Sequence, residues 1–379
     1  MPNKNFSLMI VHPEGNWTSN PSLKSFIDLI LEKNIGVILM APGQLPVAYK
    51  DKIKHIELNR FYLSAFVKIS DYIHIEAISK LYTHVWKTVK LENILTIISV
   101  DRVGLIISTM LVEKLCVKHV HWSFEITFEE EVGSVYKRLE RNLLKRVDAV
   151  LIQDLIRADV FAKENEYNKK NIHVVPLSSR GPVNKCQFRV RDQLGIRPHD
   201  KVCLFMGSTA KWTMLSSVLA TVNKWPDDWK LLIVSDKNIN EGYPTISANP
   251  KVFIYNKRFE FVDDMANLMN GINLGIGFYD PDYNGKYTGK NLKYLGLASG
   301  KLNTYLRYNI PILMNDKNLY KEHNKTQKFA INIKGCVSEE IPNLLNHYKD
   351  LSFGNRPRAF YENYLMFEKY ENVILKLVL

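Results

Sequence analysis

Short apolar runs rich in β-branched residues alternate with helical segments along this chain, and this alternation limits the folds open to it. In the first half the runs cover residues 7–11, 36–40, 96–100, 119–122, 149–153 and 172–176. Short apolar strands separated by helices are typical of a parallel sheet covered by helices on both faces. The sequence therefore predicts a doubly wound α/β domain over residues 1–182.

A second series of such runs follows a turn-rich break at residues 178–182. Its runs cover residues 202–206, 231–235, 252–255, 273–278 and 310–314. We therefore expect a second doubly wound domain over residues 183–355, and both domains have an ordinary length. Residues 356–379 interleave aromatic and charged side chains, which predicts a terminal amphipathic helix that needs an apolar surface.

Composition excludes several classes of protein. The 379 residues are 46% hydrophobic and 24% charged, which is typical of a globular chain and excludes disorder as its main state. The net charge of +12, larger in residues 181–379 than before them, favours phosphates or an anionic surface as partners. Because no run of five basic residues and no aromatic–basic RNA motif occurs, we expect no nucleic-acid partner.

Signals for export, membrane insertion and metal binding are weak. The start of the sequence lacks a signal-peptide pattern, and the most apolar stretch, residues 94–112, carries Asp101 and Arg102 near its middle. The four cysteines are far apart and have no metal-ligand spacing, so we interpret them as reduced thiols. These features predict a cytoplasmic protein with no bound metal.

The strongest candidate for phosphate binding is Ser299-Gly300-Lys301, which opens a helix before an apolar strand run. Ligands of parallel sheets bind at the carboxyl ends of the strands, where helix N-termini present unpaired N–H groups to anions. Backbone amides, the Ser299 hydroxyl and the Lys301 ammonium could therefore converge on one phosphate. The alternative is an ordinary N-cap serine followed by a solvated lysine.

Two further strand-to-helix loops contain small residues that allow close approach of a ligand. Gly207, Ser208 and Lys211 follow the first strand run of the second domain. Gly15 and Asn16 follow the first strand run of the first domain, and together with Asp101 and Arg102 they are our candidates for lining a ligand cleft there. Neither loop is G-x-G-x-x-G, which disfavours a dinucleotide site.

Candidates for acid–base chemistry lie at the end of the fourth strand run of the first domain. His121 and Glu125 are the residues that could accept a proton from an incoming hydroxyl. The alternative for Glu125 is that it opens a solvated acidic run that continues at residues 129–131. A serine-nucleophile triad is disfavoured because no G-x-S-x-G elbow follows a strand.

Two stretches carry a resemblance to a known family. Residues 299–313 read SGKLNTYLRYNIPIL, and residues 139–154 read LERNLLKRVDAVLIQD. The first resembles the K-L-x-E-Y-L…G-x-P-V-I element, and the second the E-R-x-x-L-x-x-A-D-x-V-I-x-x-D segment, of glycosyltransferases with the two-Rossmann (GT-B) fold. The chain looks similar to family 4 glycosyltransferases and their bacterial relatives.

The resemblance implies two Rossmann-like domains facing across a cleft, with the terminal helix crossing back to the first domain. It implies that the second domain holds a nucleotide-sugar donor, with uridine favoured as its base, and that the first holds the acceptor. On the donor side it adds Thr304 and Tyr305 beside Lys301, and Arg258 completes our donor-side candidates. The resemblance also implies that transfer is independent of metal. No cofactor is expected, because the nucleotide sugar is itself a substrate.

The chain also departs from the family pattern. Family members carry two glutamates around the phosphate helix, whereas this chain has Gly296 and Thr304 there. The usual basic residues after the glycine of the second domain are displaced as well, so we expect Lys211 and Lys301 to share their task. These departures leave an alternative open: a non-catalytic GT-B-fold partner or chaperone subunit of another glycosyltransferase.

The expected reaction moves a sugar to a hydroxyl of a glycan or lipid-linked acceptor in bacterial surface polysaccharide or glycoconjugate synthesis. Lys301 would neutralise the departing diphosphate, where negative charge builds. The resemblance favours retention of the anomeric configuration; with inversion, Glu125 or His121 would be the base. Attachment to the anionic inner face of the cell membrane is a further expectation.

Overall fold

The computed structural model describes residues 6–58, 83, 85–87, 89, 92–236, 238–243, 246, 249–257, 259–261, 265–284, 287–315, 319–348 and 351–379. The chain divides into two compact units. The first unit consists of Met1–Pro176 and Phe367–Leu379, and the second unit of Leu177–Met366. The sequence had predicted the division between domains at residue 182.

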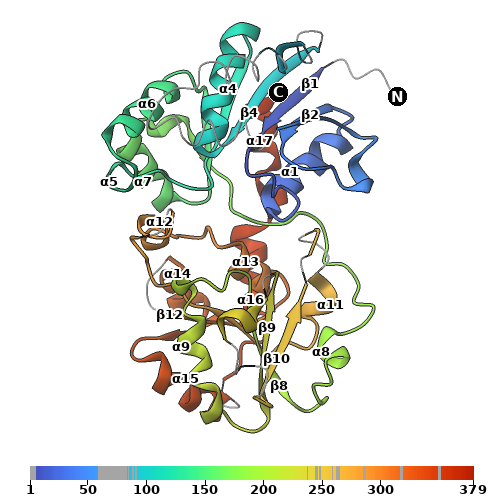
Figure 1. The fold of residues 1–379 in the computed structure, drawn as a ribbon, viewed down its shortest axis with the longest axis vertical. Helices are drawn as coiled ribbons and strands as arrows, with labels where there is room; N and C mark the ends of the chain where they lie inside the picture. The colour runs from blue at the N-terminus through green and yellow to red at the C-terminus, as the bar shows by residue number, and fades with distance from the viewer. Residues whose placement is uncertain are drawn as a thin grey trace. The chain divides into compact units, whose positions relative to one another are not determined.

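The described part of the first unit contains a seven-stranded parallel sheet with the order β3-β2-β1-β4-β5-β6-β7 (Figure 1). Its strands are β1 (Ser7–Val11), β2 (Gly36–Ala41), β3 (Ile53–Glu57), β4 (Ile94–Val100), β5 (Lys118–Trp122), β6 (Ala149–Ile152) and β7 (Ile172–Val174). Its α-helices are α1 (Pro21–Glu32), α4 (Asp101–Leu115), α5 (Glu129–Val132), α6 (Ser134–Leu144), α7 (Leu155–Asn165) and α17 (Glu371–Val378).

The described part of the second unit contains a six-stranded parallel sheet with the order β10-β9-β8-β11-β12-β13 (Figure 1). Its strands are β8 (Lys201–Met206), β9 (Trp229–Ser235), β10 (Val252–Asn256), β11 (Leu274–Gly277), β12 (Ile312–Asn315) and β13 (Ala330–Ile333). Its α-helices are α8 (Val190–Gln193), α9 (Leu215–Leu219), α10 (Ile239–Gly242), α11 (Ala266–Met269), α12 (Lys290–Lys293), α13 (Gly300–Arg307), α14 (Leu319–Gln327), α15 (Val337–Asn346) and α16 (Arg356–Phe360).

Each sheet has the strand order of a doubly wound fold. The chain starts near the middle of the sheet, runs to one edge and returns to build the other half, so the direction reverses between β1 and β4 in the first unit. In the second unit it reverses between β8 and β11. Ligands of such sheets bind outside the carboxyl ends of the strands at this switch point. The two switch points are therefore the places where a site is expected.

The second sheet is buried on both faces by separate apolar clusters. Along β8, Val202 and Leu204 belong to one cluster, whereas Cys203 and Phe205 belong to the other. This alternation follows from the two-residue period of a strand. The near-continuous apolar runs in the sequence thus reflect burial on both faces.

The α/β prediction with two Rossmann-like domains is confirmed, but two strands were missed. The strands β3 and β13 lie at sheet edges, and both are short. Along β3 only Ile53 and Ile56 are buried, because one side of an edge strand meets solvent and carries polar residues. An edge strand of this kind lacks the continuous apolar run by which the central strands were recognised.

The prediction of one continuous terminal helix is wrong. The α16 helix passes into a π-helical turn at Tyr361–Leu365, and the backbone is extended at Met366. A 3₁₀ turn at Phe367–Tyr370 and the α17 helix then complete the chain. The break at Met366 is where the chain leaves the second unit, so the two parts bury their apolar faces in different cores.

Phe360, Tyr361 and Leu365 pack in the core of the second unit. In the first unit, Thr96 on β4 donates a hydrogen bond to the carbonyl oxygen of Val378 at 2.8 Å. The terminal segment therefore packs partly on the second unit and partly on the first. Among the helices that the described residues form, none is both long and apolar enough to cross a membrane.

Candidate functional site

At the switch point of the second unit lies an ammonium over two aromatic rings. The Nζ atom of Lys301 is 5.0 Å from the ring centroid of Phe205, in β8, and 4.9 Å from that of Tyr279, just after β11. It forms no hydrogen bond or ion pair with any residue that the structure describes. Burial lowers the pKa of Lys301 to about 8. A half-buried cation held only by ring faces is a strong attractor for an anion.

The start of α13 is fixed by a network around Ser299. The Ser299 hydroxyl accepts the backbone N–H of Leu302 at 3.2 Å and shares a 2.6 Å hydrogen bond with the Tyr279 hydroxyl. The Asn315 side chain in turn holds the backbone of Tyr279, with contacts of 3.1 and 2.7 Å. The N-cap alternative for Ser299 is thereby confirmed. Its hydroxyl already has partners, so the anion-facing groups are the Lys301 ammonium and the N–H groups of the first turn, which begins at Gly300.

Two neighbouring candidates on α13 have their hydroxyls engaged within the fold. The Thr304 hydroxyl donates to the carbonyl oxygen of Gly300 at 2.7 Å, and its side chain is buried. Tyr305 is completely buried, and its hydroxyl donates to the carbonyl oxygen of Leu204 at 3.1 Å. A side chain enclosed in the core cannot contact a ligand, so the expectation for Tyr305 is corrected: it anchors α13 on the sheet.

The loop after β8 is open, as the sequence predicted. Gly207 has a φ of +98°, and a Cβ there would meet no atom within 4 Å. The hydroxyl of the exposed Ser208 accepts the backbone N–H of Ala210 at 3.2 Å. Lys211 is the basic residue of this loop, and its side chain is exposed. Trp212 stacks on Tyr279, with centroids 6.0 Å apart and planes at 10°. Trp212 thus connects this loop to Tyr279, one of the two rings beneath Lys301.

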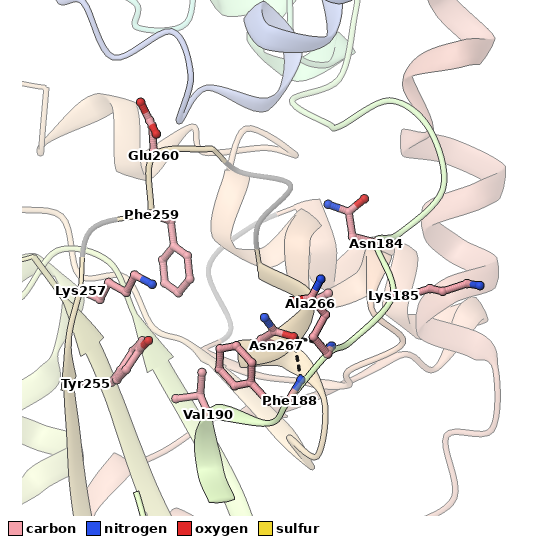
Figure 2. Close-up of a pocket in the computed structure, with 11 residues that line it drawn as sticks. Asn184, Lys185, Phe188, Val190, Tyr255, Lys257, Phe259, Glu260, Ala266 and Asn267 are labelled. Atoms are coloured by element: carbon pink, nitrogen blue, oxygen red, sulfur yellow. Dashed lines mark hydrogen bonds between the residues drawn. The ribbon is translucent and has the colours of Figure 1, made fainter. Parts of the chain in front are cut away.

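A pocket of about 760 Å³ lies beside the end of β10 in the second unit. Figure 2 shows Tyr255, Lys257 and Phe259 on one side of it, with Phe188 and Asn267 opposite them. The Asn267 amide oxygen accepts the backbone N–H groups of Gln187 and Phe188 at 2.8 and 3.3 Å, which fixes that wall. Arg258, one of the predicted donor-side residues, lies outside the described residues.

The switch point of the first unit is acidic instead. Asp101 opens α4 directly after β4, and its Oδ1 atom accepts the backbone N–H groups of Phe124 and Glu125 at 2.7 and 2.9 Å. Asp101 is only 9% exposed, and burial, followed by the nearby Glu14, raises its pKa well above the usual range. The side chains predicted from the ends of β4 and β5 are therefore brought together.

Glu125 is half-buried in the same group of carboxylates. Burial raises its pKa to about 7, against the opposing charge of Arg157 and with the help of Glu14 and Glu131. A carboxyl group with a pKa near 7 is well matched to accepting a proton or a hydrogen bond at neutral pH. The solvated-run alternative for Glu125 does not fit this burial.

His121 is placed differently from Glu125. Its ring is 1% exposed within the sheet layer, where Nδ1 lies 3.0 Å from the Ser99 hydroxyl. Burial lowers its pKa to about 3, and the ring lies 6.2 Å from that of Phe161. Because this imidazole is enclosed by the core, the geometry favours Glu125 over His121 as the group that is open to a ligand.

The remaining candidates of the first unit lie in the loop after β1 and in the first turn of α4. Gly15 has a φ of +74°, and a Cβ there would approach Pro42 to 2.7 Å, so only glycine fits. The Asn16 amide oxygen lies 2.8 Å from Nε2 of His12. The guanidinium of Arg102 packs on the Tyr136 ring at 4.6 Å. Gly15 and Asn16 shape the loop, whereas Arg102 joins α4 to α6.

The sequence reading missed several residues that build these two edges. Tyr279, Trp212 and Phe205 supply the ring faces around Lys301, and Glu14 and Arg157 set the charge around Glu125. Tyr279 could have been noticed because it comes just after a strand, at the carboxyl edge, and Trp212 because it follows Lys211 in a loop that was already a candidate. Arg157 lies in the first turn of α7, and no local pattern in the sequence marks it as a partner of Glu125.

No protein-family model and no curated protein matches the chain. Solved structures match it over nearly its whole length. Anabaena HepE in complex with UDP and glucose has a TM-score of 0.72 at 12% identity, with 98% of each chain covered. Sucrose-phosphate synthase from Thermosynechococcus elongatus has a TM-score of 0.73 at 9% identity, again with 98% of each chain covered. A glycosyltransferase from Rickettsia africae has a TM-score of 0.69 at 14% identity, covering 99% of this chain and 98% of its own.

At such low sequence identity, the similarity shows only that the backbones are arranged in the same way. Both parallel sheets, their strand orders and the return of the C-terminal segment to the first unit agree with the fold that the sequence predicted. The chain has the two-Rossmann, GT-B fold of these glycosyltransferases.

Proposed function

We propose that the protein is a glycosyltransferase whose second unit binds a nucleotide-sugar donor through its diphosphate. The observation that carries this proposal is the Lys301 ammonium, which has two ring faces beneath it and no anionic partner among the described residues. It lies beside the N-terminus of α13 at a switch point, where dipole and free N–H groups also attract an anion. The likeness in fold to HepE, a protein solved with UDP, supports a uridine donor.

The pocket beside β10 is our proposed place for the base. The strand β9 separates β10, beside the pocket, from β8, which carries Phe205 beneath Lys301, and two strand spacings amount to about 10 Å. One nucleotide can span a separation of this size. The rings of Phe259 and Tyr255 offer stacking faces, and a stacked base contributes about 1–3 kcal/mol. Phe259→Ala should therefore weaken UDP binding about tenfold while leaving pyrophosphate binding unchanged. Tyr283, 60% exposed and outside this pocket, gives the control variant Tyr283→Ala.

The proposed chemistry is metal-independent transfer. As the bond from the anomeric carbon to the diphosphate breaks, negative charge builds on the leaving group. Lys301, Lys211 and the first turn of α13 neutralise that charge. With retention of configuration, which we favour, a diphosphate oxygen takes the proton of the acceptor hydroxyl. Glu125 of the first unit then accepts a hydrogen bond from a neighbouring hydroxyl of the acceptor and so orients the acceptor; with inversion, Glu125 is the base.

The acceptor in this proposal is a glycan or a lipid-linked glycan bound by the first unit. Synthesis of a bacterial surface polysaccharide or glycoconjugate is the corresponding role, in the cytoplasm and at the inner face of the membrane. Binding to vesicles of anionic lipid that weakens with salt would support the membrane part. Proton NMR of the product would decide between retention and inversion.

A non-catalytic partner subunit is the second candidate. It is favoured by Gly296 and Thr304, which stand where related enzymes carry glutamates, and by the Thr304 hydroxyl, which is bonded within α13. Such a subunit would bind the nucleotide without turning it over.

Calorimetry and thermal shift with UDP, GDP and uridine, followed by assays of UDP release from UDP-sugars, test both candidates. We expect UDP to raise the melting temperature more than uridine, because a ligand that binds only the native state stabilises it. UDP release with an acceptor present supports transfer. Binding without hydrolysis or transfer supports the partner subunit, and failure of every nucleoside diphosphate to bind contradicts the donor site.

A further inference from the structure

The three residues after β5, Ser123–Glu125, form an irregular loop in which every backbone polar group has a partner. The N–H of Ser123 donates to the carbonyl oxygen of Leu151 at 3.0 Å, and its carbonyl oxygen accepts the amide of Gln153 at 2.6 Å. The carbonyl oxygen of Phe124 accepts Arg157 at 2.7 Å. The carbonyl oxygen of Glu125 accepts the Ser123 hydroxyl at 3.0 Å. Asp101 accepts the two remaining N–H groups, those of Phe124 and Glu125.

Such complete pairing by side chains is unusual for three residues outside a strand or helix. Buried backbone groups need partners, but loops ordinarily find them in water or in other backbone. Here Asp101, Gln153 and Arg157 reach the loop from two helices and a strand end, so the direction in which Glu125 leaves the backbone is fixed.

The backbone at Asp101 is itself in an uncommon conformation. Its φ is +52°, in the left-handed region, where Asp and Asn are tolerated better than other side chains. The residue is also only 9% exposed, and its carboxyl group lies near those of Glu14 and Glu125. A strained backbone and a buried carboxyl group cost free energy and are kept only where the surrounding structure imposes them. Because such features cluster at functional sites, they suggest that Asp101 has a functional role.

We propose that Asp101 is a positioning residue that holds the Glu125 carboxyl group toward the acceptor through the two backbone bonds of its Oδ1 atom. The proposal rests on the proposed function, in which Glu125 hydrogen-bonds a hydroxyl of the acceptor. Asp101 itself does not touch the substrate. A group held within a fraction of an ångström of its working position reacts faster, and misplacement by about 1 Å can lower the rate about 100-fold.

The charged groups around Glu125 determine how the pH profile of the rate would change in a variant. Asp101 lies at the end of β4, Glu14 after β1, Glu131 on α5, and Asp154 and Arg157 at the start of α7. Burial raises the pKa of Glu125, Arg157 lowers it, and Glu14 and Glu131 raise it further. A variant that only removes a charge therefore shifts the pH profile, whereas a variant that releases the loop lowers the rate at every pH.

The experiment compares Asp101→Gly with Asp101→Asn in the full chain. Glycine avoids strain at φ +52° and removes the side chain, whereas asparagine keeps an acceptor oxygen that can take both N–H groups. We expect kcat to fall about 10- to 100-fold in Asp101→Gly, with a smaller change in the acceptor KM, and to stay within a few-fold of wild type in Asp101→Asn. Hydrogen exchange of the amides of Phe124 and Glu125 should become faster only in the glycine variant.

Asp148 supplies the matched control. Its carboxylate accepts the backbone N–H of His119 at 2.7 Å, at the opposite end of the same strand. Asp148→Ala removes a comparable carboxylate–backbone bond, so it should leave kcat within a few-fold of wild type. A general effect of loosening β5 would instead lower kcat in both variants and would overturn the proposal.

A double variant separates positioning from other roles. Because Asp101 acts through Glu125, Asp101→Gly should have little further effect on kcat in a Glu125→Gln background. Additive losses would overturn the proposal, as would wild-type kcat in Asp101→Gly. If the wild-type protein binds UDP but transfers no sugar, the proposed function itself fails, and the exchange data would then describe only a braced loop.

Discussion

The two units share one topology and place opposite chemistry at the same point of it. In the first unit the switch point carries Asp101, Glu14 and Glu125, and burial holds the pKa of Glu125 near 7. In the second unit it carries Lys301, and burial lowers its pKa to about 8. Burial disfavours the charged form in both cases, so the acid and the base move toward neutral pH from opposite sides.

The two edges also differ in how their functional side chains are held. Glu125 stands on a loop whose backbone is paired throughout, largely by side chains of other elements. Lys301 stands on the first turn of a helix and rests on ring faces. A single carboxyl group that must point in one direction needs a braced loop. An ammonium that attracts a flexible diphosphate acts as a point charge and needs only a desolvated place.

The largest effect is expected when the positive charge of Lys301 in the second unit is removed. Lys301→Ala should lower turnover about 100- to 1,000-fold, because a group that stabilises the departing diphosphate is removed. UDP should also bind more weakly. Lys325, which is exposed and paired with Glu322 at 2.7 Å in the same unit, supplies the control Lys325→Ala. Steady-state kinetics and calorimetry measure both variants, and normal turnover in Lys301→Ala would remove the phosphate assignment.

The corresponding change in the first unit is expected to be smaller. Glu125→Gln should lower kcat/KM about 10- to 100-fold, because a hydrogen bond to a charged group contributes about 1.5–3 kcal/mol. In the wild type, kcat/KM should rise with pH as Glu125 ionises near 7 and fall as Lys301 loses its proton near 8. The variant should lose the acid limb and keep the alkaline one. An acid limb that survives in Glu125→Gln would assign that limb to another group.

Central strands could be predicted from the sequence because burial on both faces leaves an uninterrupted apolar run. The predicted runs coincide closely with β1, β2 and β8, for example. The edge strands β3 and β13 could not be found in this way, since half of each strand faces solvent. The terminal segment was predicted as one helix because its aromatic period continues through Met366, where the chain passes from one core to the other.

Within the candidate sites, charged residues next to strand ends were predictable and their partners were not. Glu125 could be identified because it follows an apolar run, and Lys301 because it opens a helix before one. That Ser299 is bonded to Tyr279, or that Tyr305 is enclosed by the sheet, depends on packing between segments far apart in the sequence. His121 shows the same limit: its place near a strand end was correct, but strand alternation turns its ring into the core.

The stability of the two edges should respond to pH in opposite directions. Native Glu125 keeps its proton to about pH 7, whereas in the unfolded chain it ionises near 4.5, so the native state binds more protons between these values. Its contribution to stability therefore falls as pH rises from about 4.5 to 7. Lys301 loses its proton near 8 when native and near 10.5 when unfolded, so its contribution rises across that window.

Denaturant unfolding of wild type, Glu125→Gln and Lys301→Met at several pH values measures these contributions as differences between wild type and variant. We expect each difference to change by the order of 2 kcal/mol across its window, after allowance for partial exposure. The comparison with variants is needed because the buried histidines of the first unit also titrate below pH 6.5. A difference that is flat with pH would show that the group is not desolvated in the native state.

The smallest expected effect compares two helix caps. Ser299 accepts the N–H of Leu302 at the start of α13, and Asn20 accepts the N–H of Leu23 at the start of α1. Either residue replaced by alanine should lower the free energy of unfolding by about 1 kcal/mol, because one N–H of the first turn loses its partner. Only Ser299→Ala should also weaken UDP binding, by a few-fold, since it loosens the turn and the Tyr279 ring beneath Lys301. Equal UDP affinity in both variants would mean that the first turn of α13 does not face the diphosphate.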